Sequence, residues 1–552
     1  MHTNDQPTIA IASNFTVESI REPLEYWLEE LGIDFKVVFC PFDQVIQQIL
    51  DPGSSLATAQ FATILLQLER WARSPADPVD QARLQQNADL FVKAIQTAVA
   101  RGRSTDFLAI FCPPAPSLLQ NSSFASIETT LHDGLNRLPG VDVLTSRDLE
   151  VLYPNENYAF YFDRNAEHLA QEPYTRLCFT MLGTVVARKL YALKSDTRKV
   201  IAVDCDNTLW SGVCGEHGPE GIVVDRHRED LQRFLLKQSE GGRLLCLCSK
   251  NDEKDVFSVF NQHPEMPLRL DHFTKWKINW NPKSDNIRVL SAELGLGLNS
   301  FVFIDDDPFE CSAMEAAIPN VLTLHLPPSG AEYESFLRSV WDLDLKRTTD
   351  DDRKRMFYYR QNAERVQALA QTTSMEDFLD TLELRVDISP LAKADIVRAA
   401  QLTERVNQFN LNGIRRSEAE LRGLLNGETA ECLIVRASDR FGEYGTVGVM
   451  IVHRNHKRLK IASLALSCRA LGKGIEQHIL NKLVTLAQSA GARTLDFDYR
   501  PTTRNTSFGM FLRSLGALKT NGRCSLDRDF LIERSSVSSS RFVLDPNLRY
   551  TD

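Results

Sequence analysis

Short apolar runs recur through residues 1–345, and stretches with a helical pattern separate them. They are Thr8–Ser13, Phe35–Phe39, Thr63–Leu68, Phe107–Phe111, Val200–Val203, Leu244–Leu247 and Phe301–Ile304. A short run without polar alternation is typical of a strand that is buried on both faces. Strands of this kind that alternate with helices form parallel sheets. The pattern therefore predicts α/β folds.

The chain of 552 residues is longer than one hydrophobic core usually organises, so we expect a multidomain protein. The two series of apolar runs predict α/β domains at 1–195 and 196–345. Residues 346–381 are rich in charge and predict a helical linker, because a charge run is usually a solvated face. Residues 382–552 mix strand-like runs with helices and predict a third, α+β domain.

Composition excludes several classes of protein. The formal net charge of -10 argues against a general nucleic-acid binder, since phosphate backbones demand an excess of Lys and Arg. No apolar run approaches the ~20 residues that span a bilayer, and the amino terminus lacks the basic start of a secretory signal. The eleven cysteines are odd in number and scattered, unlike a disulfide framework. We expect a cytoplasmic protein with neither nucleic acid nor membrane as partner.

Two aspartates, Asp204 and Asp206, follow the apolar run Val200–Val203. Side chains at i and i+2 on a strand point the same way, so both carboxylates are expected to face one crevice at the carboxyl end of the strand. One carboxylate can attack phosphorus, and the other can transfer protons. For this pair alone, a plain turn at the end of a strand explains the residues equally well.

Polar residues also follow the next two apolar runs. The run Leu244–Leu247 leads into Ser249, Lys250 and Asn251, whose hydroxyl and amides could cradle phosphate oxygens. Lys283 precedes a helical stretch, and Phe301–Ile304 leads into Asp305 and Asp306. Acidic residues at the carboxyl edge of a sheet suit a hard cation with oxygen ligands, such as Mg2+. Phosphoryl transfer needs this cation and a lysine that offsets developing charge.

In this order, the nucleophile, hydroxyl, lysine and acidic pair resemble the four motifs of the haloacid dehalogenase (HAD) superfamily. The resemblance implies a HAD-like Rossmannoid domain. It makes Asp204 the nucleophile and a magnesium ligand, and Asp206 the acid/base and a further residue of the metal site. Ser249, Lys250, Asn251 and Lys283 would bind phosphate. Asp306 would be a direct metal ligand and Asp305 a supporting one.

Five longer segments narrow the resemblance to the FkbH family within this superfamily. They are Asp204–Trp210, Gly212–Glu216, Phe303–Glu310, Val406–Asn410 and Arg440–Gly445. The family serves polyketide and mixed peptide–polyketide assembly lines. The resemblance implies a glyceryl transferase/phosphatase. Such an enzyme takes the acyl group of 1,3-bisphosphoglycerate onto a cysteine, removes the 3-phosphate, and loads glyceryl onto a phosphopantetheinylated acyl carrier protein.

This reaction requires a cysteine near Asp204, because an acyl phosphate is an activated donor that a thiolate can attack. Cys205 lies between the two aspartates, where strand alternation turns it toward the back of the sheet. Cys214 lies in a glycine-flanked loop that could cover the site. We favour Cys214, although a small buried loop residue would have the same sequence context.

The carboxyl-terminal region resembles a GNAT acyltransferase. Cys468 and Arg469 follow a strand-like run, and Gly472 and Gly474 precede a helix, where free backbone amides suit a phosphate. Asn505 belongs to a segment that resembles the closing GNAT motif. The resemblance implies a GNAT-like α+β domain in which Arg469, Gly472, Gly474 and Asn505 hold a carrier protein or its pantetheine arm. A docking module without catalysis remains open, as does a structural or relay role for Cys468.

The amino-terminal region resembles the degenerate SGNH-hydrolase-like domain of the same family. Ser13 follows the first apolar run, where such hydrolases place their nucleophile. Gln171 stands where a histidine is expected, and His168 cannot be assumed to replace it. We therefore expect a structural domain.

Two alternatives to glyceryl transfer stay open at the level of the sequence. One is a magnesium-dependent HAD phosphatase that acts on a small or carrier-bound phosphate ester and needs no cysteine. The other is a module that docks a carrier protein. Another three-carbon or amino-acyl unit could also replace glycerate.

Overall fold

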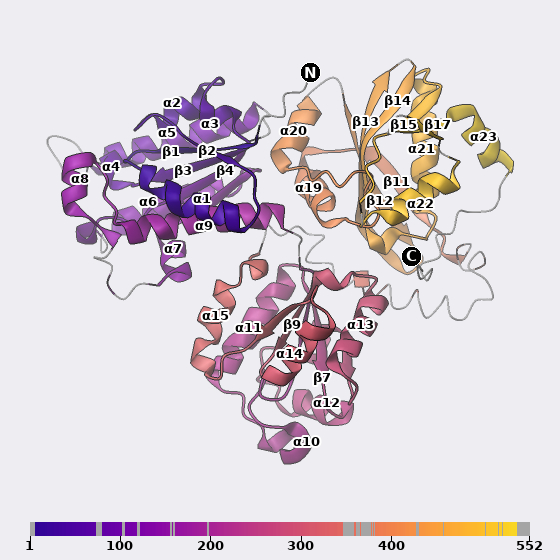
Figure 1. The fold of residues 1–552 in the computed structure, drawn as a ribbon, viewed down its shortest axis with the longest axis horizontal. Helices are drawn as coiled ribbons and strands as arrows, with labels where there is room; N and C mark the ends of the chain where they lie inside the picture. The colour runs from indigo at the N-terminus through magenta and orange to yellow at the C-terminus, as the bar shows by residue number, and fades with distance from the viewer. Residues whose placement is uncertain are drawn as a thin grey trace. The chain divides into compact units, whose positions relative to one another are not determined.

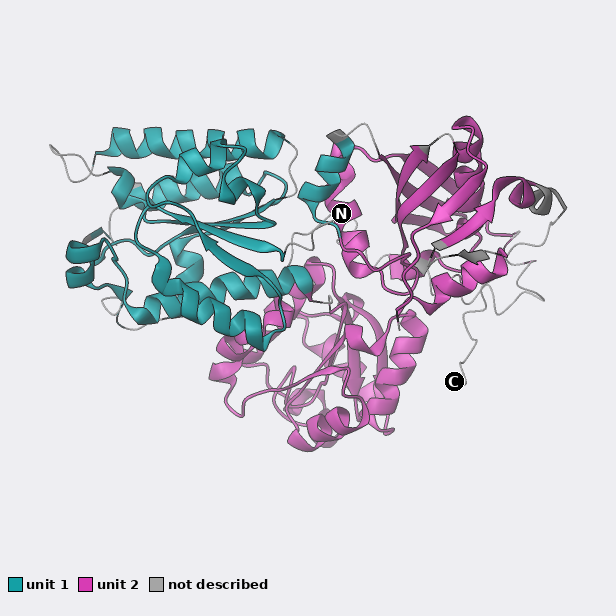
Figure 2. Cartoon of the chain, turned by 45° about the horizontal axis from the view of Figure 1, so that its top comes forward, with its two compact units in different colours: residues 1–194, 416–428 teal, residues 195–415, 429–552 magenta. Residues whose placement is uncertain are grey.

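The computed structural model describes residues 6–537 with gaps. Outside the described residues lie 73–79, 102–104, 119–121, 155–156, 158–160, 196–197, 427–429, 456, 503, 517, 521–522 and 346–380, although Tyr358, Tyr359, Gln361, Arg365, Asp377 and Leu379 of that last stretch are described. The predicted linker at 346–381 therefore falls almost entirely outside them. The chain divides into two compact units, 1–194 with 416–428 and 195–415 with 429–552 (Figure 2).

The first unit is built on a five-stranded parallel sheet in the order β2-β1-β3-β4-β5 (Figure 1). Its strands are β1 (Thr8–Ser13), β2 (Lys36–Phe39), β3 (Phe61–Leu66), β4 (Asp106–Phe111) and β5 (Val141–Leu144). Its helices are α1 (Arg21–Glu30), α2 (Val45–Leu50), α3 (Ser55–Thr58), α4 (Glu69–Ala72), α5 (Gln81–Ala100), α6 (Ser122–Leu135), α7 (Ser146–Leu152), α8 (Arg164–Ala170), α9 (Arg176–Lys194) and α20 (Glu418–Asn426).

In the first unit, every second residue of a strand points to the same face of the sheet and packs into the same hydrophobic cluster. Ala62, Ile64 and Leu66 of β3 share a cluster with apolar residues of α2, α3, α5 and α6. Every residue of β3 is nevertheless buried, as predicted for a strand covered on both faces. Helices α1 and α9 pack closely at Gly183, which has no Cβ. A Cβ at this position would lie only 3.0 Å from Pro23 Cγ.

The second unit contains a second five-stranded parallel sheet, in the order β10-β9-β6-β7-β8. Its strands are β6 (Val200–Val203), β7 (Leu244–Ser249), β8 (Phe273–Ile278), β9 (Phe301–Asp305) and β10 (Leu322–His325). Its helices are α10 (Cys214–His217), α11 (Arg226–Glu240), α12 (Glu253–Gln262), α13 (Lys283–Leu294), α14 (Pro308–Ala317) and α15 (Tyr333–Ser339). Ile201 and Val203 pack with α11, α12 and α15, whereas Val200 and Ala202 pack with α13 and α14.

A seven-stranded mixed sheet completes the second unit, in the order β11-β12-β13-β14-β15-β17-β16. Its strands are β11 (Arg385–Pro390), β12 (Glu431–Asp439), β13 (Gly442–Asn455), β14 (Arg458–Leu466), β15 (Thr494–Phe497), β16 (Leu518–Thr520) and β17 (Arg523–Asp527). Its helices are α19 (Ile396–Arg405), α21 (Ile475–Ser489), α22 (Thr506–Ser514) and α23 (Arg528–Val537). Among the described strands of this sheet, only β14 and β15 pair in parallel, and α21 connects them.

The pairing of β14 changes partner along its length. Arg458–Ile461 pair with β15, but from Leu464 to Leu466 the strand pairs with the segment 409–411. The Leu411 amide donates to the Leu464 carbonyl at 2.9 Å, and the Leu466 amide donates to the Phe409 carbonyl at 3.0 Å. The edge of β14 that β15 leaves open is therefore filled by the chain itself. Across the described residues, no helix combines the length and apolar character that crossing a membrane requires.

Candidate active site

Three parallel strands of the second sheet end in polar residues that meet at one edge. Asp204 follows β6, Ser249 ends β7, and Asp305 ends β9. Because β6 lies between β7 and β9, the three side chains come from neighbouring strands. All three residues are buried. The carboxyl edge of a parallel sheet is where α/β proteins bind ligands, as the sequence predicted for these residues.

Lys283 lies between two of the carboxylates. It opens α13, and its ammonium Nζ lies 2.8 Å from Asp204 Oδ1 and 2.6 Å from Asp305 Oδ2. Burial alone would lower the pKa of Lys283, but the charges of Asp204 and Asp305 outweigh it and raise the pKa above its usual value. Burial raises the pKa of Asp305 to about 7, and the charge of Asp204 adds to this increase. Burial raises the pKa of Asp204 as well.

Asp204, Asp305 and Asp306 form a group that could hold a metal ion. Each offers one carboxylate oxygen, and the three oxygens lie within 4.8 Å of one another. Oxygen ligands of Mg2+ lie about 2.0–2.1 Å from the ion in octahedral geometry, so neighbouring ligands are about 3 Å apart and opposite ligands about 4 Å apart. The donor type and spacing therefore fit Mg2+. Three carboxylates also exceed the single ammonium of Lys283 in charge, which favours a divalent cation.

The carboxylate of Asp206 is not part of this metal group. Its Oδ1 accepts hydrogen bonds from Trp210 Nε1 at 2.8 Å and from the Cys214 amide at 3.1 Å, and its Oδ2 accepts one from Asn251 Nδ2 at 3.0 Å. The rule for strand side chains does not apply here, because β6 ends at Val203. The chain then turns through Asn207, whose φ is 56°. Asp206 is thereby directed at the loop that carries Cys214.

The predicted phosphate-binding residues divide into two groups. Ser249 Oγ accepts a hydrogen bond from Asn251 Nδ2 at 3.2 Å, and Ser249 also hydrogen-bonds Asp204. Ser249, Asn251 and Lys283 therefore lie together around the two aspartates. Lys250 is different, because its ammonium pairs with Glu310 at 2.5 Å and is 38% exposed. Lys250 lies at the rim of the site.

Both candidate cysteines are buried next to the aspartates. Cys214 begins α10, its Sγ lies 3.7 Å from Asn251 Oδ1, and it is 2% exposed. Burial, reinforced by the charge of Asp206, raises the pKa of Cys214 to about 12. Cys205 is fully buried in the core, and burial raises its pKa well above the usual range. Both thiols are therefore protonated near neutral pH, and a thiol is a poor nucleophile.

The sequence missed two residues that orient the aspartates. Thr208 Oγ1 donates a hydrogen bond to Asp306 Oδ1 at 2.8 Å, and the Trp210 indole holds Asp206. Both belong to the segment that follows Asp204. Their place in that segment was the available signal, but nothing in the sequence assigned them a partner.

The residues predicted to hold pantetheine lie after β14, outside the aspartate cluster. Gly472 and Gly474 have φ of 71° and 87°, and the Gly472 amide donates to Glu476 Oε1 at 2.7 Å. Asn505 Nδ2 donates to the carbonyls of Asn410 and Arg500, at 2.9 Å each. The side chain of Arg469 lies outside the described residues. Internal groups thus already contact Gly472 and Asn505.

The amino-terminal residues do not gather around a comparable cluster. Ser13 Oγ accepts a hydrogen bond from the Phe15 amide at 3.1 Å. Gln171 ends α8 in a left-handed conformation, and its carbonyl accepts from the Thr16 amide. His168 is exposed on the same helix. These contacts support local turns, and the SGNH-like assignment stays a prediction.

Solved structures of other proteins resemble parts of this chain. One is the N-terminal part of the protein BF1531 from Bacteroides fragilis, which contains a phosphatase domain and was crystallised with Mg. It is 21% identical, with a TM-score of 0.53, over 63% of this chain and 96% of that one. At this identity the likeness shows a shared fold, and the HAD-like assignment stays a prediction from the sequence motifs.

The ribosomal-protein-S18-alanine N-acetyltransferase from Escherichia coli also matches, with 14% identity over 30% of this chain and 100% of that one. Its TM-score of 0.21 is too low to support an argument, so the GNAT-like assignment stays a prediction from the sequence motifs. No protein-family model matches the sequence, and no curated protein matches it.

Proposed function

We propose that the edge of the second sheet is a magnesium-dependent phosphoryl-transfer site in which Asp204 is the nucleophile. The observation that carries this proposal is the Lys283 ammonium between Asp204 and Asp305, beside a third carboxylate from Asp306. A bound Mg2+ would polarise a phosphate oxygen and neutralise charge as it develops. The shared fold with a protein that contains a phosphatase domain adds support.

The side chains can carry out a two-step hydrolysis. A carboxylate oxygen of Asp204 attacks phosphorus to form an acyl phosphate, while Asp206 gives a proton to the leaving alcohol oxygen. Asp206 then takes a proton from water, whose oxygen attacks the same phosphorus and releases inorganic phosphate and free Asp204. Ser249 and Lys283 contact the phosphate oxygens and offset their charge.

The Asp206 carboxylate has one hydrogen-bonding site left for the group with which it must exchange a proton. A carboxylate has about four lone-pair sites, and three of those of Asp206 are used by Trp210, Cys214 and Asn251. One site is left for a leaving-group oxygen or a water. The three donors fix the orientation of the carboxylate, and a fixed orientation is what efficient proton transfer requires.

We extend the proposal to glyceryl transfer from 1,3-bisphosphoglycerate, with Cys214 as the acyl acceptor. Its place between Asp206 and Asn251 supports this role. In the loading step the thiol proton passes to Asp206, the sulfur attacks the acyl carbon, and the phosphate on that carbon leaves. Asp204 next removes the 3-phosphate. The phosphopantetheine thiol of an acyl carrier protein then takes the glyceryl group and regenerates Cys214.

A phosphatase without acyl transfer is the second candidate, and one observation favours it. Cys214 is buried and its pKa is raised to about 12, so the loading step needs Asp206 to act as a base on a shielded thiol. A phosphatase would need the Asp204 and Asp206 pair but no cysteine. The third candidate, a carrier-docking module, gives no reason for a lysine held between two buried carboxylates.

Intact-protein mass spectrometry after incubation with 1,3-bisphosphoglycerate and Mg2+ tests these candidates. We expect a hydroxylamine-sensitive glyceryl adduct that Cys214→Ala lacks and the control Cys40→Ala keeps. In Asp204→Asn the adduct should retain its phosphate. No adduct, with phosphate released from simple esters, would support the phosphatase alone. Undiminished phosphate release from simple phosphate esters by Asp204→Asn would overturn both enzyme proposals.

A further inference from the structure

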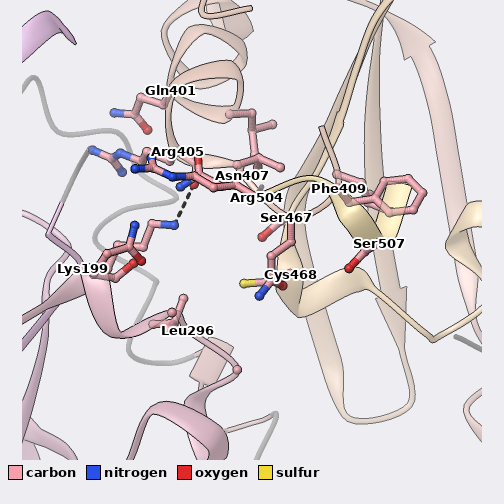
Figure 3. A pocket seen from close by; sticks show the side chains of 18 of the residues that line it. Lys199, Leu296, Gln401, Arg405, Asn407, Phe409, Ser467, Cys468, Arg504 and Ser507 are labelled. Atoms are coloured by element: carbon pink, nitrogen blue, oxygen red, sulfur yellow. Dashed lines mark hydrogen bonds between the residues drawn. The ribbon is translucent and has the colours of Figure 1, made fainter. Parts of the chain in front are cut away.

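A cavity of about 360 Å³ lies in the second unit at the carboxyl end of β14, and four cationic side chains line it (Figure 3). These are Lys199, Arg398, Arg405 and Arg504. Among the described residues that line the cavity, none carries a carboxylate. Its volume lies in the range of small-molecule sites. We name it the Cys468 cavity, after the cysteine on its wall.

The cationic groups are held in place by the surrounding chain. Lys199 Nζ donates to the Arg405 carbonyl at 2.7 Å. Arg398 donates to Gln401 Oε1 at 3.3 Å and to the Thr446 carbonyl at 3.2 Å. A guanidinium fork can donate two parallel hydrogen bonds to the oxygens of a phosphate or a carboxylate, so this cluster suits an oxyanion.

Two further features of the wall point to an organic phosphate ester. The first turn of the nine-residue helix α22 contributes Thr506 and Ser507, and the start of a helix favours an anion. Leu296 and Phe409 add apolar surface, which an inorganic anion would not need. The wall therefore combines groups for a phosphate with groups for a carbon chain.

The nearby glycine turn is a weaker candidate for the same ligand. The Gly472 amide donates to the carboxylate of Glu476, which is 3% exposed, so an internal anion already contacts the turn. The edge of β14 from Leu464 to Leu466 is likewise paired with the segment 409–411. Groups of the chain itself thus already occupy both places, which leaves the Cys468 cavity as the stronger candidate.

We propose that the Cys468 cavity is a second ligand site, which binds a small organic phosphate ester through its arginines and brings it against the Cys468 thiol. The ester can be the phosphopantetheine arm of a carrier or a free phosphorylated acid. This site is independent of the phosphatase proposal, because it shares no residue with the aspartate cluster.

The alkylation rate of Cys468 can report whether a ligand occupies the cavity. The other ten cysteines are buried, whereas Cys468 is partly exposed, so brief alkylation of the native chain with iodoacetamide should modify it first. Peptide mapping by mass spectrometry then gives its alkylation rate with and without three probes: 4′-phosphopantetheine, 3-phosphoglycerate and inorganic phosphate. We expect one ester to slow alkylation at least fivefold in a saturable way. The ester that protects identifies the source of the ligand.

Arg504→Gln is the test variant, since Arg504 is exposed and its replacement should leave folding intact. We expect a concentration for half-protection at least tenfold higher. Arg500→Gln removes the same charge four positions away, outside the cavity wall, and should protect like the wild type. If no ester protects Cys468, if only inorganic phosphate does, or if both variants behave alike, the proposal is wrong. Isothermal titration of the same probes provides a second measurement without alkylation.

Discussion

The carboxyl edge of the second sheet and the glycine turn after β14 each contain a lysine among acidic side chains, but their charge balance differs. At the edge, Lys283 contacts Asp204 and Asp305, and Asp306 lies beside them. Two carboxylates thus contact one ammonium, and a third carboxylate lies beside those two. The pKa of the lysine is raised, because the negative charges outweigh the effect of its burial.

At the glycine turn the charges are matched within the chain. Arg365 forms two hydrogen bonds with Asp439, and Glu476 accepts the Gly472 amide. The ammonium of Lys473 lies 4.8 Å from the centre of the Tyr444 ring. Burial, followed by the charge of Arg365, lowers the pKa of Lys473 to about 7.

The carboxyl edge of the second sheet has more negative than positive charge, whereas the acidic groups of the glycine turn already contact other groups of the chain. An excess of buried negative charge is unfavourable without a cation, so the edge is suited to bind one. At the glycine turn Arg365 pairs with Asp439 and Glu476 accepts the Gly472 amide, so these acidic groups do not require a further cation. A phosphate-type sequence motif, such as two glycines before a helix, is therefore insufficient evidence for a ligand.

Lys283→Met would break the comparison most strongly. We expect phosphate release to fall by roughly 10²–10³-fold, because the group that offsets the charge on phosphate is lost. The free energy of unfolding should fall by about 3–5 kcal/mol, since Asp204 and Asp305 would stay buried without a partner. Steady-state kinetics and urea unfolding measure the two effects.

Lys473→Met is the matched control for that variant, because it removes the same charge from the glycine turn. Phosphate release by Lys473→Met should remain within about twofold of the wild type. Equal losses in the two variants would show that the edge of the second sheet has no special role for its lysine.

Thr208→Val should have a smaller and more selective effect. It removes the hydroxyl that orients Asp306 and leaves a side chain of similar volume. Losing such a partner typically weakens metal binding by about 10–100-fold. The Mg2+ concentration for half-maximal phosphate release should rise accordingly, while the rate at saturating Mg2+ changes little. Thr208→Ser keeps the hydroxyl and should behave like the wild type. An unchanged Mg2+ dependence in Thr208→Val would remove Asp306 from the metal site.

The sequence predicted the location of the site better than its internal contacts. The sequence predicted that Asp204, Ser249 and Asp305 lie close together, because the carboxyl ends of neighbouring parallel strands share an edge. The direction of Asp206 could not. It depends on where β6 ends and on the positive φ of Asn207, and neither follows from the spacing of two aspartates.

Long-range contacts of the third sheet were also beyond prediction. The pairing of Asn410 with Ala465 joins segments that are far apart in the chain, and Asn505 donates to the Asn410 carbonyl across a longer separation still. Residues of this kind have ordinary polar side chains, and no local pattern specifies their partners. Periodicity predicts which face of an element is buried, but not which internal group fills a turn.

The last prediction sharpens the comparison through the pH dependence of stability. The pKa of Lys473 is about 7 in the folded chain and about 10.4 in an unfolded one, so between these values the unfolded chain binds more protons. Stability therefore rises with pH from about 7 to 10, with a slope of at most about 1.4 kcal/mol per pH unit from this group. Below pH 7 both states are protonated, and the folded state carries the full cost of the buried charge.

Lys473→Met should remove this slope and raise the unfolding temperature at pH 6.5, yet leave it nearly unchanged at pH 10. Thermal unfolding across this range measures the effect, with Lys482→Met on α21 as a control that keeps the slope. An unchanged slope in Lys473→Met would mean that the turn holds its lysine charged, and the contrast with Lys283 would then be lost.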